Sequence, residues 1–130
     1  MGTDKPAKYC LVVDDAGPVR VVARRILEGF GMSVREAADG RAALEACRSA
    51  MPDAILLDWN MPALDGLGFM QRLRASDGGE GPRVVFCTTR SEVSDIECAL
   101  AAGADEYIIK PFDIRVLNQK FRSLGLIEPV

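Results

Sequence analysis

The sequence predicts a doubly wound α/β fold, in which helices cover both faces of a parallel sheet. Short apolar runs such as Tyr9–Val13 and Ala54–Leu57 alternate five times with stretches whose apolar residues recur every three or four positions. The connecting segments are short. Continuous apolar runs are typical of strands buried on both faces of a parallel sheet, and right-handed crossovers leave few topologies for such a chain.

Length and composition suit one globular domain. The 130 residues are 48% hydrophobic and 27% charged, and the formal net charge of −3 provides no general attraction to nucleic acid or to an anionic membrane. No apolar run has the length of a membrane span, and the polar start lacks the apolar core of a signal peptide. We expect a short polar segment at 1–7, a domain at 8–126, no output domain, and a cytoplasmic location.

Cysteine and histidine usage excludes several kinds of chemistry. The four cysteines (Cys10, Cys47, Cys87 and Cys98) form no C-x-x-C pair, and three of them lie in apolar surroundings. We interpret these as small core residues rather than zinc ligands. The chain contains no histidine, so it has no histidine general base, no histidine-based triad and no phosphohistidine of its own.

In the first half of the chain, the strand Tyr9–Val13 ends at Asp14 and Asp15, and Pro18 suits the first turn of a helix. The inner face of that helix is predicted to consist of Val19, Val22, Ala23, Ile26, Leu27 and Phe30. Residues 32–37 form a second strand, and Asp39 can cap a helix that runs to about residue 50. The pair Met51-Pro52 ends this helix before the central strand.

In the second half, a helix follows Asp65-Gly66 and faces inward through Leu67, Met70 and Leu73. The glycine-rich residues 77–82 form a loop. A fourth strand, 83–87, ends at Thr88 and Thr89. The remaining elements are a helix over 91–102 that Gly103 closes, a strand over 105–109, and a last helix from Asp113 with Leu117, Phe121 and Leu124 inward.

Polar side chains stand where four of these strands end. The first strand leads to Asp14 and Asp15, the third to Asp58, the fourth to Thr88 and the fifth to Lys110. Because the carboxyl ends of parallel strands share one edge of the sheet, we expect these side chains to converge there. A carboxylate that follows a buried strand, as Asp58 does, is costly unless it is paired or bound to metal, although a turn cap would also explain it.

This combination of side chains favours metal-assisted phosphoryl chemistry. Two carboxylates 4 Å apart repel by about 4 kcal/mol at an effective dielectric near 20, and Mg²⁺ relieves such repulsion. Carboxylates such as Asp58 can form aspartyl phosphates when a metal and a cation neutralise the transferring group. Thr88 would then donate its hydroxyl to one phosphoryl oxygen, and Lys110 would pair with another.

Four features together resemble the receiver domains of two-component response regulators, over nearly the whole chain. They are the pair Asp14-Asp15, Thr88 at the end of its strand, and two longer motifs. Residues 58–66 (D-W-N-M-P-A-L-D-G) match D-x-x-M-P-x-x-D/G-G, and residues 102–112 (A-G-A-D-E-Y-I-I-K-P-F) match A-G-A-x-x-Y/F-x-x-K-P-F. Each is weak alone, but their order and placement at the strand ends make the set specific.

The resemblance implies a flavodoxin-like sheet of five strands in the order 2-1-3-4-5 with five helices. Asp58 would accept a phosphoryl group from a phosphohistidine on a partner histidine kinase or phosphotransfer protein. Asp15 and Asp58 would ligate Mg²⁺ directly, Asp14 through water, and Asn60 through its backbone carbonyl. The bond between Lys110 and the following proline would be cis.

The resemblance also implies a switch. The Thr88 hydroxyl would move to the phosphoryl group, and the Tyr107 ring would turn inward. The signal would leave through the fourth helix, fifth strand and fifth helix to a protein target, in chemotaxis or another phosphorelay. We expect a monomer or weak dimer without a nucleic-acid partner, and a signalling switch with only intrinsic phosphoacceptor and autodephosphorylation chemistry.

Some positions vary within the family or depart from its pattern. Asn60 and Arg90 occupy positions that tune phosphoryl lifetime in the family, while Ala16 and Thr89 replace its common residues. None of these differences removes a group that the chemistry needs.

Alternatives remain for the whole chain and for single residues. A degenerate receiver would bind partners without phosphorylation. A haloacid-dehalogenase-like phosphohydrolase needs a second Asp where Asn60 stands, and an FMN-binding domain needs a phosphate-cradling loop that Asp14 and Asp15 would repel. The two aspartates would also serve as helix caps, Lys110 as a surface lysine, and Tyr107 as a packing residue.

Overall fold

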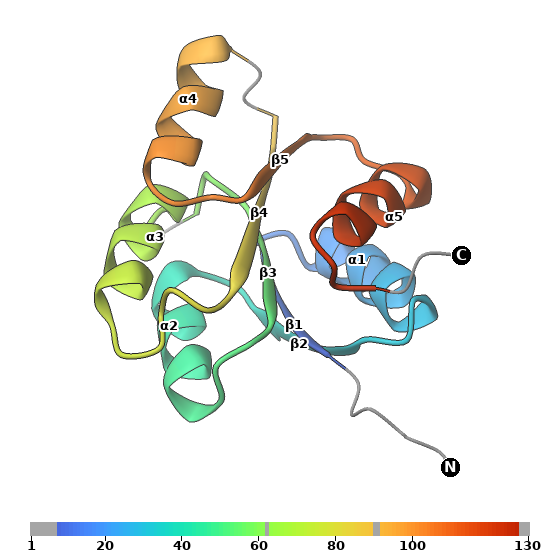
Figure 1. Ribbon diagram of the computed structural model, residues 1–130, viewed down its shortest axis with the longest axis horizontal. Helices are drawn as coiled ribbons and strands as arrows, with labels where there is room; N and C mark the ends of the chain where they lie inside the picture. The colour runs from blue at the N-terminus through green and yellow to red at the C-terminus, as the bar shows by residue number, and fades with distance from the viewer. Residues whose placement is uncertain (1–7, 62, 90–91, 128–130) are drawn as a thin grey trace.

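The computed structural model describes residues 8–61, 63–89 and 92–127. Predictions that fall on 1–7, Pro62, Arg90 or Ser91 lie outside this part of the chain. Strands and helices alternate along it (Figure 1). The strands are β1 (Tyr9–Val13), β2 (Ser33–Ala37), β3 (Ala54–Leu57), β4 (Arg83–Thr88) and β5 (Glu106–Ile109). The helices are α1 (Gly17–Gly29), α2 (Gly40–Ser49), α3 (Gly66–Ala75), α4 (Val93–Ala101) and α5 (Ile114–Ser123).

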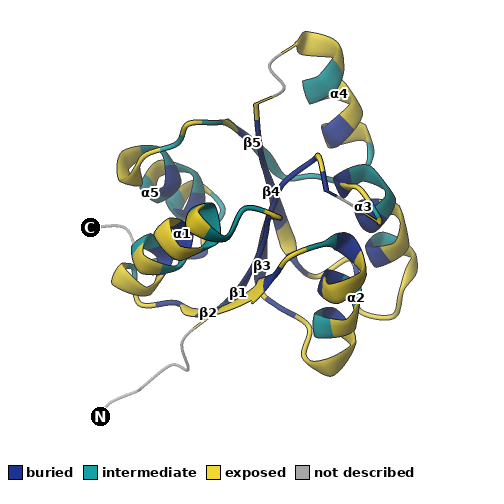
Figure 2. Cartoon of the chain, turned by 180° about the vertical axis from the view of Figure 1, so that it is seen from behind, coloured by how far each residue is buried: buried dark blue, intermediate teal, exposed yellow. Residues whose placement is uncertain are grey.

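The strands form one parallel sheet in the order β2-β1-β3-β4-β5, which confirms the predicted topology. Helices α1 and α5 cover one face, and α2, α3 and α4 cover the other (Figure 1). Neighbouring strand residues point to opposite faces. Leu57 and Phe86 therefore join the core under α2 and α3, while Leu56 and Val85 join the core under α1 and α5. Figure 2 shows the buried sheet between helices whose outer faces are exposed.

Three helices begin at an aspartate that accepts a backbone N–H of the first turn. These caps are Asp39 for α2, Asp65 for α3 and Asp113 for α5, with hydrogen bonds of 2.8, 2.8 and 3.0 Å. Among all helices of the described residues, none is long and apolar enough to cross a membrane. The caps fix where α2 and α3 start, next to the loop that follows β3.

Two predictions about buried faces need correction. Val22 was assigned to the inner face of α1, but its side chain is 51% exposed, while Ala23 and Leu27 are fully buried. Residues four apart share one stripe of the helix, and on α1 this stripe carries the fully buried residues, with Ile26 and Phe30 partly buried beside it. On α3, Phe69 is fully buried although its position was not predicted to face the core. Cys10, Cys47 and Cys87 are buried and Cys98 is exposed, as three core cysteines require.

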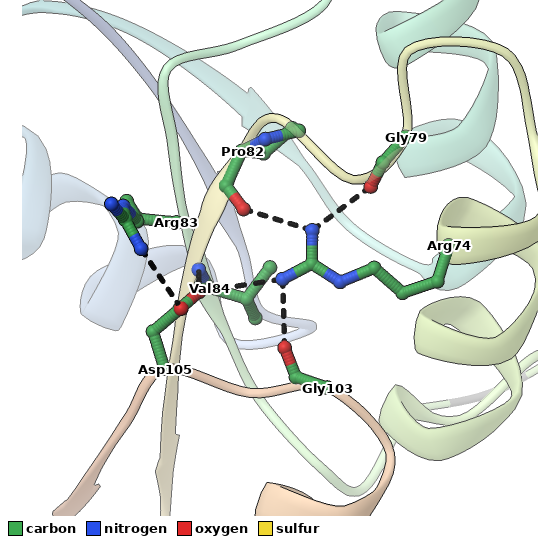
Figure 3. A network of polar contacts seen from close by, with 7 residues as sticks. All are labelled: Arg74, Gly79, Pro82, Arg83, Val84, Gly103 and Asp105. Atoms are coloured by element: carbon green, nitrogen blue, oxygen red, sulfur yellow. Dashed lines mark hydrogen bonds and ion pairs between the residues drawn. The ribbon is translucent and has the colours of Figure 1, made fainter.

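A polar network at the amino-terminal ends of β4 and β5 joins α3 to the loops that precede these strands (Figure 3). Arg74 donates from Nη1 to the carbonyl oxygens of Gly79 and Pro82, each at 2.9 Å. Its Nη2 donates to the carbonyl oxygen of Gly103 at 2.7 Å and lies 3.3 Å from Asp105 Oδ2. The same Asp105 oxygen accepts the Val84 N–H at 2.8 Å. The network thereby sets the relative positions of the two strands whose far ends carry Thr88 and Lys110.

Candidate functional site

Backbone hydrogen bonds continue past the strands and fix the residues at the carboxyl edge of the sheet. The Asp58 N–H donates to the Val13 carbonyl at 2.9 Å, and the Asp14 N–H donates to the Ala37 carbonyl at 3.1 Å. On the other side, the Lys110 N–H donates to the Thr88 carbonyl at 2.8 Å. The predicted convergence of the strand ends is therefore built by the sheet itself.

Three carboxylates meet at this edge. Ligand oxygens of Asp14, Asp15 and Asp58 all lie within 4.8 Å of one another. Asp14 and Asp58 are only 4% and 7% exposed, whereas Asp15 is exposed. Burial raises the pKa of the Asp58 carboxyl above its ordinary value, and the charge of Asp14 adds to this, against the opposing effect of Lys110. Clustered carboxylate oxygens of this kind are the ligands that a hard divalent cation prefers.

Lys110 belongs to the cluster, so its interpretation as an ordinary surface lysine is wrong. Its Nζ lies 2.6 Å from Asp14 Oδ2 and 3.5 Å from Asp58 Oδ1, and its side chain is 18% exposed. Burial by itself lowers the pKa of the ammonium group, but the hydrogen bond and charge of Asp14, with the charge of Asp58, raise it above its ordinary value. The Lys110-Pro111 peptide bond is cis, as the resemblance implies.

The carboxylates of Asp14 and Asp15 do not cap α1. The N-cap of this helix is Ala16, which makes no side-chain cap hydrogen bond. Asp14 Oδ1 instead accepts the Ala16 N–H at 2.9 Å, and its Oδ2 accepts from Lys110. Arg20 Nη1 donates to the Asp14 carbonyl oxygen at 2.6 Å. Arg20 was not predicted to take part, although a basic residue in the first turn after an acidic pair is a weak signal for such a contact.

The remaining predicted residues lie on β4, on β5 and in the loop after β3. Thr88 is fully buried at the end of β4, Asn60 is exposed two residues beyond Asp58, and Tyr107 is half-buried on β5. Tyr107 stacks on Phe86 with ring centroids 6.4 Å apart, so it has the packing contact that the alternative expects. A role in switching stays a prediction.

An aromatic row links the cluster to the edge of the sheet. The Trp59 and Phe86 centroids lie 5.5 Å apart, and Phe86 stacks in turn on Tyr107. Trp59 directly follows Asp58, and Tyr107 lies on the edge strand β5. The aromatic row was not predicted. A signal for its middle member was present, because strand alternation places Phe86 on the same face of the sheet as Thr88.

Comparison with known proteins identifies the family. The response regulator receiver domain model matches residues 10–122. The chain belongs to the response regulator receiver domain family. This membership sets aside the phosphohydrolase and FMN-binding alternatives, because receiver domains are signalling switches.

Curated relatives of this receiver domain are bacterial regulators. It is 44% identical over 114 residues to the response regulator MprA of Mycolicibacterium vanbaalenii, covering 88% of this chain and 48% of that protein. It is 40% identical over 124 residues to the transcriptional regulatory protein PrrA of Mycobacterium tuberculosis, covering 95% of this chain and 52% of that one. The chain thus spans about half the length of the curated relatives it matches.

Solved structures of similar proteins share the fold. The chemotaxis response regulator CheY4 of Vibrio cholerae superposes with a TM-score of 0.86 at 29% identity, over 91% of this chain and 98% of that one. A response regulator from Chloroflexus aurantiacus gives a TM-score of 0.85 at 29% identity, over 91% and 97% of the two chains. Both comparisons agree with the observed strand order.

Proposed function

We propose that this receiver domain accepts a phosphoryl group on Asp58 in a Mg²⁺-dependent reaction and signals by phosphorylation-dependent protein binding. One observation carries the proposal: the buried Asp58 carboxylate lies in a cluster with two further carboxylates and 3.5 Å from the Lys110 ammonium. A nucleophile, an acidic metal site and a cation are the groups that phosphoryl transfer to a carboxylate needs.

The carboxylate cluster fits a magnesium ion. Asp15 and Asp58 would ligate it directly, together with the backbone carbonyl of Asn60. Asp14 would ligate through water, because its two carboxylate oxygens already accept hydrogen bonds from Ala16 and Lys110. When bound, the metal supplies positive charge that offsets the carboxylate repulsion and the negative charge of the incoming phosphoryl group.

A phosphohistidine donor would have to lie on a partner protein, because the chain contains no histidine. A histidine kinase or a histidine phosphotransfer protein would present the phosphohistidine. The P–N bond breaks as the P–O bond to Asp58 forms, and the electron pair returns to the imidazole, which takes up a proton from solvent. Lys110 would hold one phosphoryl oxygen as a point charge, and the Thr88 hydroxyl would donate to another.

The aromatic row supports a readout on the far side of β5. Movement of Thr88 toward the phosphoryl group would free space in which the half-buried Tyr107 ring turns inward. Seven large apolar side chains are exposed in the described residues, and four of these belong to α4, β5 and α5: Val93, Leu100, Ile109 and Ile114. Exposed apolar side chains on these three elements favour a protein target there.

The biological process also belongs to the proposal. Similarity to a chemotaxis response regulator favours chemotaxis or another phosphorelay. We further propose that the receiver acts in the cytoplasm as a monomer or weak dimer. The relative named as a transcriptional regulatory protein favours a second process, control of transcription, in which this receiver would be the phosphorylated part. Phosphorylation of Asp58 is common to both.

Intact-mass spectrometry tests the phosphoacceptor. The protein is incubated with a small phosphodonor, with and without Mg²⁺, alongside Asp58→Asn and the control Asp77→Asn, which changes an exposed loop carboxylate. Wild type and Asp77→Asn should gain one phosphoryl group only with Mg²⁺, and Asp58→Asn should gain none. Equal labelling of Asp58→Asn, or no labelling of wild type, would contradict the proposal and favour a degenerate receiver.

Partner binding tests the switch. The ratio of target affinities with and without phosphorylation is compared between wild type, Tyr107→Phe and Tyr107→Ala. The ring-retaining Phe variant should keep most of the ratio, and the Ala variant should lose it. A ratio that Tyr107→Ala leaves unchanged would remove Tyr107 from the switch.

A further inference from the structure

The loop that follows Asp58 is held between two helices by glycine contacts. Leu64, near its end, lies against Gly40, the first residue of α2. A Cβ atom at Gly40 would clash with the Leu64 carbonyl oxygen and would come within 2.8 Å of the Leu64 Cβ. A Cβ atom at Gly68 of α3 would come within 2.7 Å of Leu64 Cδ1. A side chain at Gly40 would therefore press on the Leu64 backbone, whereas one at Gly68 would press on the end of the Leu64 side chain.

The same loop folds back on its own beginning. The Gly66 N–H donates to the Trp59 carbonyl at 2.9 Å, and a Cβ at Gly66 would come within 2.7 Å of the Asp58 carbonyl oxygen. Ala63 has a φ of 69°, a left-handed backbone that a residue with a side chain adopts only when its surroundings impose it. The Gly66–Trp59 hydrogen bond thus joins the two ends of the loop, so a shift at Leu64 reaches Asn60 through Asp65, Gly66 and Trp59.

We propose that Gly40 is a positioning residue for the metal site, acting through Leu64 on the loop that presents the Asn60 carbonyl. Gly40 lies on α2, which contributes no member of the carboxylate cluster. The inference rests on the proposed function, in which Asn60 supplies a backbone ligand. Mg²⁺ requires near-ideal octahedral geometry with oxygens at about 2.0–2.1 Å, so displacing one ligand by a few tenths of an ångström weakens binding.

The first test compares Gly40→Ala with Gly29→Ala. Gly29 is also helical, and a Cβ atom there meets nothing within 4 Å. Titration calorimetry with MgCl₂, or the fluorescence of the single tryptophan Trp59, gives the Mg²⁺ dissociation constant. Gly40→Ala should raise the Mg²⁺ dissociation constant roughly tenfold, as substitutions of residues that support metal ligands commonly do. Gly29→Ala should leave this constant within about twofold of the wild-type value.

Saturating Mg²⁺ separates positioning from chemistry. The rate of phosphorylation of Gly40→Ala should approach that of wild type once the metal is saturating, because every group of the cluster is still present. A variant that is merely less stable would lose unfolding free energy in EDTA without a change in its Mg²⁺ dissociation constant. That result would overturn the role of Gly40.

A double-mutant cycle covers the case in which Gly40→Ala does not fold. A Cβ at Gly68 meets mainly the Leu64 side chain, which Leu64→Ala truncates. Gly68→Ala and Leu64→Ala should each weaken Mg²⁺ binding. The double variant should bind Mg²⁺ no more weakly than the single variant with the lower affinity, because both substitutions act through one contact. Losses that add in the double variant would contradict the inference.

The outcomes also separate this inference from the proposed function. Wild type that binds Mg²⁺ and becomes phosphorylated, with folded Gly40→Ala that binds Mg²⁺ equally well, would refute the positioning role alone. Wild type that binds no Mg²⁺ would refute the proposed function and the inference together.

Discussion

The two edges of the sheet use charge in opposite ways. At the amino-terminal ends of β4 and β5, the Arg74 guanidinium is surrounded by three carbonyl oxygens and the Asp105 carboxylate (Figure 3). At the carboxyl edge, three carboxylates lie together and the Lys110 ammonium contacts two of them, Asp14 and Asp58, so negative charge is in excess. One edge pairs its charges within the chain, whereas the other keeps an excess of negative charge, which the proposed magnesium ion would offset.

This difference indicates that the amino-terminal edge contributes to the stability of the fold, whereas the carboxyl edge is suited to binding a cation. Hydrogen bonds to a charged donor contribute about 1.5–3 kcal/mol each when they are sheltered from water, as those of Arg74 are. Repulsion among buried carboxylates opposes folding and is recovered when a metal binds. Substitutions at the two edges should therefore change stability in opposite directions.

The largest effect is expected at the amino-terminal edge. Arg74→Ala removes the donor for three carbonyls and leaves Asp105 without this partner, so the free energy of unfolding should fall by about 3 kcal/mol. Urea denaturation measures it. The control Arg48→Ala removes an ion pair whose side chains are 74% and 67% exposed, and should change stability by about 0.5 kcal/mol or less. Equal effects of the two substitutions would break the comparison.

Mg²⁺ should stabilise the carboxyl edge by mass action. At ten times its dissociation constant, the ion should raise the free energy of unfolding of wild type by about 1.4 kcal/mol. Urea titrations with and without MgCl₂ measure the difference, with Asp15→Asn and Arg74→Ala for comparison. The increase should shrink in Asp15→Asn and persist in Arg74→Ala. A similar increase in all three proteins would indicate a general salt effect.

Removing a carboxylate should stabilise the metal-free protein. Asp58→Asn relieves repulsion with Asp14 and Asp15, and in EDTA at neutral pH it should raise the free energy of unfolding by about 1 kcal/mol. The folded protein holds the pKa of Asp58 above its ordinary value, so wild type loses stability as pH rises through that window. The advantage of Asp58→Asn should therefore shrink as pH falls. A destabilised Asp58→Asn would contradict the excess of negative charge.

The smallest effect tests which arginine matters in the amino-terminal network. Arg83 reaches Asp105 at 3.4 Å, but its side chain is 55% exposed. Arg83→Ala should lower the free energy of unfolding by about 0.5 kcal/mol or less, because water screens and replaces the pair. A loss of unfolding free energy as large as that of Arg74→Ala would show that burial does not decide how much each arginine contributes to stability.

The candidate site was predictable because it follows from topology. Once the strands are parallel, Asp14, Asp58 and Lys110 must reach one edge, although Asp14 and Lys110 are 96 residues apart in sequence. The family motifs add the strand order of the sheet. The ligands of the Arg74 network follow no such rule, because carbonyl oxygens in irregular loops carry no residue-specific signal.

Close packing was also beyond the sequence. Periodicity assigns Val22 and Leu27 to one broad face of α1, but the width of the contact with the sheet decides that only Leu27 is buried. Likewise Gly40 is an unremarkable helix start in the sequence. Its contact with Leu64 depends on how closely α2 approaches the loop after β3, which only the assembled structure determines.

The most direct measurement locates the phosphoryl group on the chain. Borohydride reduces an aspartyl phosphate to homoserine, which peptide mass spectrometry identifies by position. After incubation with a phosphodonor, homoserine should appear at position 58 alone, and only when Mg²⁺ is present. Homoserine at Asp14 or Asp15, or at position 58 without Mg²⁺, would contradict the account of the carboxyl edge as a metal-dependent phosphoacceptor.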